Sequence, residues 1–162
     1  MHAYARTWTI FLLFLALAFG CGPATANGPR LQVEAAWARP TASGGSHPAG
    51  SQGEEKSMGS IGAVYFTLIN SGDQPDRLLR VTTTVAEKAE LHQTRVEEGV
   101  ARMVPVTDGV PIPAGERVVF EPGGYHVMLM GVRQPLRPGD RFSLTLILEQ
   151  SDPITVNVEV SP

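Results

Sequence analysis

The chain has 162 residues, with 13 basic and 16 acidic side chains, a formal net charge of −3 and one cysteine. This length suggests a single domain. The slight acidity gives no electrostatic footprint for binding nucleic acid or an anionic membrane surface. A lone cysteine also excludes an internal disulfide framework, so the domain depends on its hydrophobic core for stability.

The N-terminus has the layout of a secretory signal peptide. Arg6 precedes an apolar run at 8–20, which is shorter than the roughly 20 residues that a spanning helix needs. The triplet Ala-Thr-Ala at 24–26 predicts cleavage after the second alanine, which would leave residues 27–162 as a periplasmic domain and 1–26 as the leader. The alternative is a lipoprotein anchored through Cys21, because this cysteine directly follows the apolar run.

Beyond the leader, the pattern is that of an all-β domain. Residues 41–60 are rich in Gly, Ser, Ala and charge, and we expect them to form a flexible loop. No other segment has a sustained helical period. Short alternating segments at a spacing of roughly 8–12 residues predict a β-sandwich or barrel. The expected strands are 31–37, 61–70, 77–85, 89–96, 100–106, 117–121, 125–131, 141–149 and 154–160.

Most of the histidine and methionine residues beyond the leader lie in the second half of the chain, which is rich in expected strands. In GGYHVMLMG (123–131), a strand would place His126, Met128 and Met130 on one face. His92 and Met103 would lie on the two strands of a hairpin that turns at EEG. Three strands could therefore bring His92, Met103, His126 and Met128 to one point.

Two imidazoles and two thioethers form a soft, uncharged ligand set, which suits Cu(I). Hard cations would find no oxygen ligands here, and zinc prefers thiolate, imidazole or carboxylate. A blue-copper centre needs a cysteine thiolate, which the exported domain lacks. Binding without thiolate also fits an oxidising compartment.

Plainer interpretations exist for each residue. Methionine often fills gaps in a core, which is an alternative for Met130 in particular, and His92 could be an exposed strand residue. His47 and Met58 lie in the expected loop, where solvated side chains are the default and a second, weak copper site, possible for Cu(II), is the alternative. The sequence contains no phosphate-binding loop, nucleophile elbow or paired-cysteine motif, so we expect no enzyme activity.

Several blocks resemble the periplasmic copper chaperones called PCu(A)C. They are AAWAR, GAVYFTLINSG, DRLLRV, AELHQT, RMVPV, PIPAGERVVFEPGGYHVMLMG and PLRPGDRFSLTL, which together span about 33–160. The family's signature of a His, a distant Met and a late His-x-Met is similar to His92, Met103, His126 and Met128. The resemblance implies a cupredoxin-like Greek-key β-sandwich that binds Cu(I). It also implies delivery of copper to the Cu(A) centre, or another copper site, of a terminal oxidase such as cytochrome c oxidase. The expected partner is a copper-accepting protein, either a respiratory oxidase subunit or its assembly factor.

Three features depart from that family. The expected loop at 41–60 is longer than is typical. The gap between Met103 and His126 is one residue longer than usual, and the extra residue falls in the turn-rich segment TDGVPIPAG. The chain also lacks the His/Met-rich C-terminal tail that some members carry for Cu(II). Two other classes remain open, namely a metal-free β-sandwich that binds a protein partner and, less favoured, a copper redox enzyme.

Overall fold

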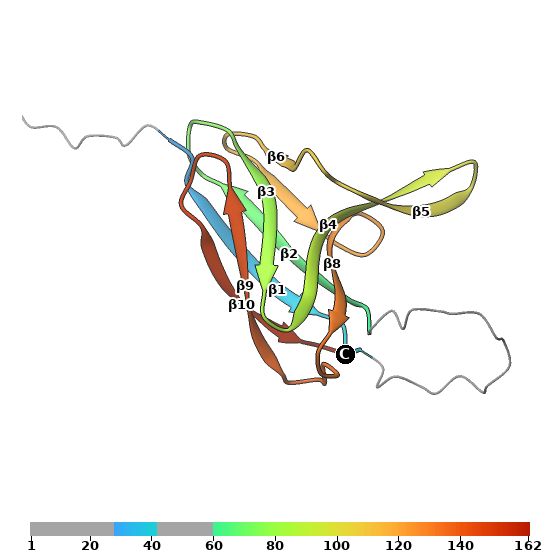
Figure 1. Cartoon of the computed structure of the whole chain (residues 1–162). Coiled ribbons are helices and arrows are strands. Elements are labelled where there is room, and N and C mark those ends of the chain that lie inside the picture. The colour runs from blue at the N-terminus through green and yellow to red at the C-terminus, as the bar shows by residue number, and fades with distance from the viewer. Residues whose placement is uncertain (1–27, 42–59) are drawn as a thin grey trace, which may run out of the picture.

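The computed structural model describes residues 28–41 and 60–162 (Figure 1). The expected leader, Cys21, His47, Met58 and nearly all of the expected loop lie outside the described residues. Within the described ranges, no helix is long and apolar enough to cross a membrane.

Every regular element of the described ranges is a β-strand, which confirms the all-β prediction. Alternation of apolar and polar residues favours strands because successive side chains point to opposite faces. The strands are β1 (Leu31–Ala38), β2 (Gly62–Asn70), β3 (Asp76–Thr83), β4 (Ala86–Glu97), β5 (Val100–Pro105), β6 (Val110–Ile112), β7 (Arg117–Phe120), β8 (Tyr125–Val132), β9 (Arg141–Leu148) and β10 (Ile154–Val160).

The strands form one mixed sheet in the order β5-β4-β8-β7-β2-β1-β10-β9-β3-β6, with a further pairing of β8 to β2. Most pairs are antiparallel, whereas β1 pairs with β10 and β7 pairs with β8 in parallel. The sheet folds around a hydrophobic core to which β2, β3, β4, β8 and β9 all contribute buried residues. This arrangement agrees with the expected cupredoxin-like fold.

Strand β6 is the one element that the sequence pattern misses. Its three residues, Val110–Ile112, contain Pro111 and lie between turn residues, so they show too little alternation to predict a strand. Val110 and Ile112 are nevertheless buried, and β6 pairs with β3 at the edge of the sheet. Tertiary burial therefore decides the conformation here.

The inward face of β8 fixes the direction of its candidate ligands. Val127 and Leu129 are fully buried in the core. Because side chains alternate along a strand, His126 and Met128 must point to the opposite face. The hydrophobic core thus determines which face carries the histidine and the methionine.

A two-residue turn joins β4 to β5. Glu98 and Gly99 both have positive φ angles, of 52° and 80°, as a type I′ hairpin turn requires, and Gly99 takes this conformation without a steric penalty. The turn predicted at EEG is therefore present. The hairpin extends away from the body of the sheet, and β5 is the edge strand (Figure 1).

Candidate metal site

Strand register places all four candidate ligands on one face. Strand β4 pairs with β8 so that His92 lies opposite His126 and Glu90 lies opposite Met128. On its other side, β4 pairs with β5 so that Thr94 lies opposite Met103. Residues directly opposite each other share a face, as do residues two apart along a strand. The sequence-predicted set therefore lies on one surface of three neighbouring strands.

The two histidines are close neighbours. The ring centroids of His92 and His126 are 5.9 Å apart, with an angle of 41° between their planes. His126 is 5% exposed, and its Nδ1 lies 3.2 Å from the carbonyl oxygen of Gly124. A carbonyl only accepts hydrogen bonds, so in the neutral ring Nδ1 donates and Nε2 keeps the lone pair. His126 is thereby prepared to bind a metal through Nε2.

Three of the four candidates line one cavity of about 450 Å³. His92 does not line this cavity but lies beside it, next to His126. Most of its described lining residues are apolar, and Arg39 is the one charged residue among them. The lining residues are Arg39, Pro40, Ile61, Gly62, Ala63, Tyr65, Thr94, Met103, Pro122, Gly123, His126 and Met128.

The methionines differ in exposure. Met103, on the projecting hairpin, is 64% exposed, whereas Met128 is half-buried between β4 and β2. Met130 shares their face by alternation but does not line the cavity. Its interpretation as a packing residue therefore remains the simpler one.

A row of aromatic rings lies beside the histidines. The sequence pattern did not predict it. Trp37 on β1 packs on Tyr65 of β2 with centroids 4.6 Å apart, and Tyr65 lies 6.5 Å from the ring of His126. The guanidinium of Arg39 lies 5.9 Å from the centroid of Tyr65. No local spacing signals this row, because it depends on the pairing of β1, β2 and β8.

In the described part of the chain, carboxylates and other hard ligands form no comparable site. Among residues 28–41 and 60–162, no three or more His, Cys, Asp or Glu side chains are grouped as a metal site would need. A metal bound at the cavity would therefore depend on the thioethers of Met103 and Met128.

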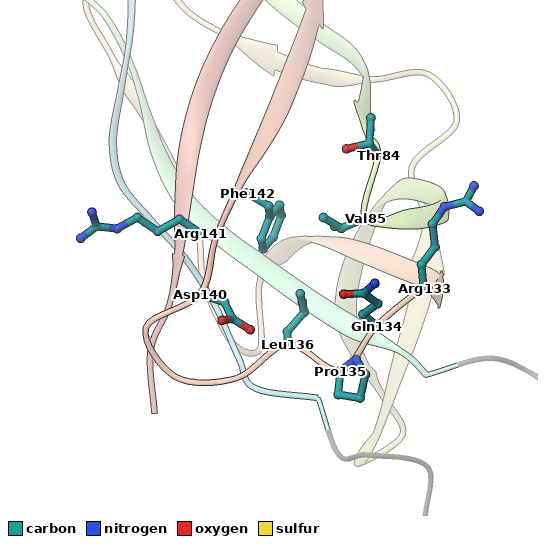
Figure 2. Close-up of a pocket in the computed structure, with 9 residues that line it drawn as sticks. All are labelled: Thr84, Val85, Arg133, Gln134, Pro135, Leu136, Asp140, Arg141 and Phe142. Atoms are coloured by element: carbon teal, nitrogen blue, oxygen red, sulfur yellow. The ribbon is translucent and has the colours of Figure 1, made fainter.

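A second cavity, of about 360 Å³, lies near the turn that precedes β9. Arg133 and Arg141 belong to its lining, but Figure 2 shows their guanidinium groups directed outward and away from each other. Arg141 instead pairs with Glu159, at 2.9 Å. The charged groups do not converge on one point, so this cavity is a weaker candidate for chemistry.

Comparison with known proteins assigns the chain to a family. The model of the LpqE-like family, described as "Putative lipoprotein LpqE-like", matches residues 31–160. The chain belongs to the LpqE-like family. A curated relative, "Putative lipoprotein Lxx21020" of Leifsonia xyli subsp. xyli, is 31% identical over 163 residues, which cover 96% of this chain and 88% of the relative.

Two solved structures of PCuAC type are similar to the present fold. One is the copper-bound PCuAC domain from PmoF2, with a TM-score of 0.56, 24% identity and coverage of 81% of this chain and 92% of that domain. The other is the solution structure of CuI-DR1885 from Deinococcus radiodurans, with a TM-score of 0.51, 27% identity and coverage of 80% and 78%. The resemblance to PCu(A)C proteins drawn from the sequence blocks is confirmed.

Proposed function

We propose that this protein is an exported copper chaperone that binds Cu(I) through His92, Met103, His126 and Met128. The ion is cargo, which the protein transfers to the copper centre of a terminal oxidase such as Cu(A) of cytochrome c oxidase. The protein then acts as a carrier and not as an enzyme.

The observation that carries this proposal is the gathering of two imidazoles and two thioethers on one face of β5, β4 and β8. Thioether sulfur is a soft ligand that favours Cu(I) over hard cations. All four groups are neutral in their binding forms, so the bound ion keeps its single positive charge. An acceptor can therefore compete for the ion without separating it from a charged ligand.

The exposure of Met103 supports a role in transfer. A chaperone site has to be reachable by the ligands of its acceptor, and Met103 is an exposed residue of an edge hairpin that also lines the cavity. Acceptor ligands can replace this thioether first, while His92 and His126 still hold the ion. Stepwise replacement avoids releasing free copper into solution.

Similar proteins support the same cargo. One neighbouring structure is a copper-bound PCuAC domain, and another is in the Cu(I) form. The relative's name also supports an exported protein. We keep cleavage after Ala26 and a periplasmic location as the prediction, with acylation of Cys21 as the alternative. The mass of the mature N-terminus distinguishes these two products.

The first test is a Cu(I) competition titration against a chromophoric chelator under reducing, oxygen-free conditions. We expect one tightly bound equivalent in the wild type and none in the double variant His126→Leu/Met128→Leu. Met130→Leu is the matched control, because it removes a thioether from the same strand and face but not from the cavity lining.

Circular dichroism must show that the double variant keeps its β structure. If the wild type takes no Cu(I) from the chelator, the copper proposal fails and a metal-free interaction module becomes the better description. Equal loss of binding in Met130→Leu would place the site elsewhere on β8.

A further inference from the structure

The two ring nitrogens of His92 have different surroundings. Nε2 lies 3.4 Å from a carboxylate oxygen of Glu90, two residues earlier on β4. Nδ1 is buried and has no hydrogen-bond partner. The His92 side chain is 11% exposed, and that of Glu90 is 43% exposed.

The contact with Glu90 determines the tautomer of a neutral His92 ring. A carboxylate only accepts hydrogen bonds, so the nitrogen that faces it carries the proton. Proton occupancy of Nε2 leaves the lone pair on Nδ1. A buried acceptor without a partner is unfavourable, and such a group in a folded protein calls for an explanation such as an absent ion.

We propose that Glu90 is a positioning residue that holds His92 in its Nε2–H tautomer, so that Nδ1 binds Cu(I). This inference rests on the proposed copper function. His126, by contrast, directs its Nδ1 at the Gly124 carbonyl and keeps its lone pair on Nε2. The two histidines thus bind the ion through different nitrogens, each fixed by an acceptor on the opposite side of its ring.

The register of the sheet also places Glu90 beside the rest of the ligand set. Glu90 lies directly opposite Met128 across the β4–β8 pair. Glu90 therefore places a negative charge on the same face of the sheet as the neutral ligand set. Because its side chain is nearly half exposed, solvent screens this charge, and we assign the main effect to the hydrogen bond.

Two variants separate the hydrogen bond from the charge. Glu90→Gln removes the charge but keeps an oxygen that can accept from Nε2–H. Glu90→Leu removes both, while leaving a side chain of similar size. Glu97→Leu is the control, because Glu97 is an exposed carboxylate on the same strand whose ion-pair partner is Arg102 and not a histidine.

The first measurement is a long-range ¹H–¹⁵N correlation spectrum of the histidine rings without copper, at a pH where both rings are neutral. We expect the Nε2–H form of His92 in the wild type and Glu90→Gln, and a mixture of tautomers in Glu90→Leu. A mixture in the wild type, or an unchanged spectrum in Glu90→Leu, overturns the assignment. This readout does not involve copper, so it remains decisive if the proposed function fails.

The second measurement is the Cu(I) competition titration of the same proteins. We expect Glu90→Leu to lose affinity about 10–100-fold, as is typical when a group that orients a metal ligand is removed. Glu90→Gln and Glu97→Leu should stay close to the wild type. Equal losses in Glu90→Gln and Glu90→Leu would assign the effect to charge, and unchanged affinity in Glu90→Leu would refute a positioning role. Absence of Cu(I) binding in the wild type would refute the proposed function itself.

Discussion

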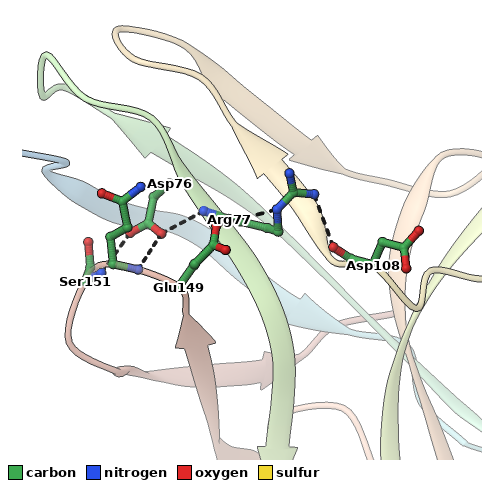
Figure 3. Close-up of polar contacts among 6 residues, drawn as sticks. Asp76, Arg77, Asp108, Glu149 and Ser151 are labelled. Carbon is green, nitrogen blue, oxygen red and sulfur yellow. Dashed lines mark hydrogen bonds and ion pairs between the residues drawn. The ribbon is translucent and has the colours of Figure 1, made fainter.

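Two buried polar groups on different strands have opposite hydrogen-bond status. Asp76, at the start of β3, is 4% exposed and accepts hydrogen bonds from the backbone N–H groups of Arg77, Gln150 and Ser151, at 2.7–3.0 Å (Figure 3). His92 on β4 has a buried Nδ1 with no partner. Through these hydrogen bonds the Asp76 carboxylate links β3 to the β9–β10 turn, whereas the Nδ1 of His92 makes no hydrogen bond that stabilises the fold.

The difference teaches how to separate structural polar groups from functional ones. A buried polar group is tolerated in a fold when its hydrogen bonds are made. Asp76 meets this condition through N–H groups of its own chain, so its burial requires no ligand. The Nδ1 of His92 meets it only if something outside the chain binds there. The contrast predicts that changes at Asp76 affect stability alone and that changes on the β5–β4–β8 face affect copper alone.

The largest expected effect is on stability, from Asp76→Leu. This change removes the acceptor of three partly buried hydrogen bonds, and we expect a loss of about 3 kcal/mol in the free energy of unfolding. Urea denaturation measures it. The Cu(I) affinity of the folded fraction should be unchanged, and a matching loss of affinity would break the comparison.

Met128→Leu should have the opposite signature. Leucine fills similar volume, so the free energy of unfolding should change by less than about 1.5 kcal/mol. Removal of a soft ligand should weaken Cu(I) binding by about tenfold or more, which corresponds to about 1.4 kcal/mol. Chelator competition and urea denaturation of one preparation give both quantities. Unchanged Cu(I) affinity would remove Met128 from the ligand set.

The smallest expected effect is a change in the free energy of unfolding at acidic pH. Burial alone would raise the pKa of Asp76, but hydrogen bonds from Arg77, Gln150 and Ser151 outweigh burial and lower it below the ordinary value. A lowered pKa adds stability that is fully present above the unfolded-state pKa and is lost as pH falls through the folded-state pKa.

The measurement compares the wild type with Asp76→Asn. We expect the difference in unfolding free energy to be constant at neutral pH and to shrink below about pH 4, near the ordinary pKa of aspartate. A difference that does not change down to about pH 2 would show that the carboxylate charge contributes nothing.

Much of the fold follows from local pattern. Segments such as RFSLTLILE and ITVNVEV alternate clearly, and the strands β9 and β10 match the predicted ranges within one residue. The pattern fails where burial is not local. The expected strand at 77–85 runs two residues past the end of β3, and the three residues of β6 become a strand only by pairing with β3.

The candidate site also combines features that local sequence pattern predicts with features that it does not. Alternation predicts that His126 and Met128 share a face, and the chain shows why, since Val127 and Leu129 are in the core. Alternation within AELH is consistent with Glu90 sharing the face of His92, but the sequence alone does not single Glu90 out. The positions of Tyr65 and Trp37 depend on the order of distant strands, which no local spacing encodes.

The position of Met103 on an exposed hairpin has a consequence for oxidation. Among the described methionines it is the most accessible to peroxide or hypochlorous acid. Conversion to the sulfoxide would replace the soft thioether with a polar group centred on a harder oxygen, which Cu(I) binds poorly. The same exposure that lets an acceptor reach the ion thus makes the protein's cargo capacity sensitive to oxidants, and reduction of the sulfoxide would restore it.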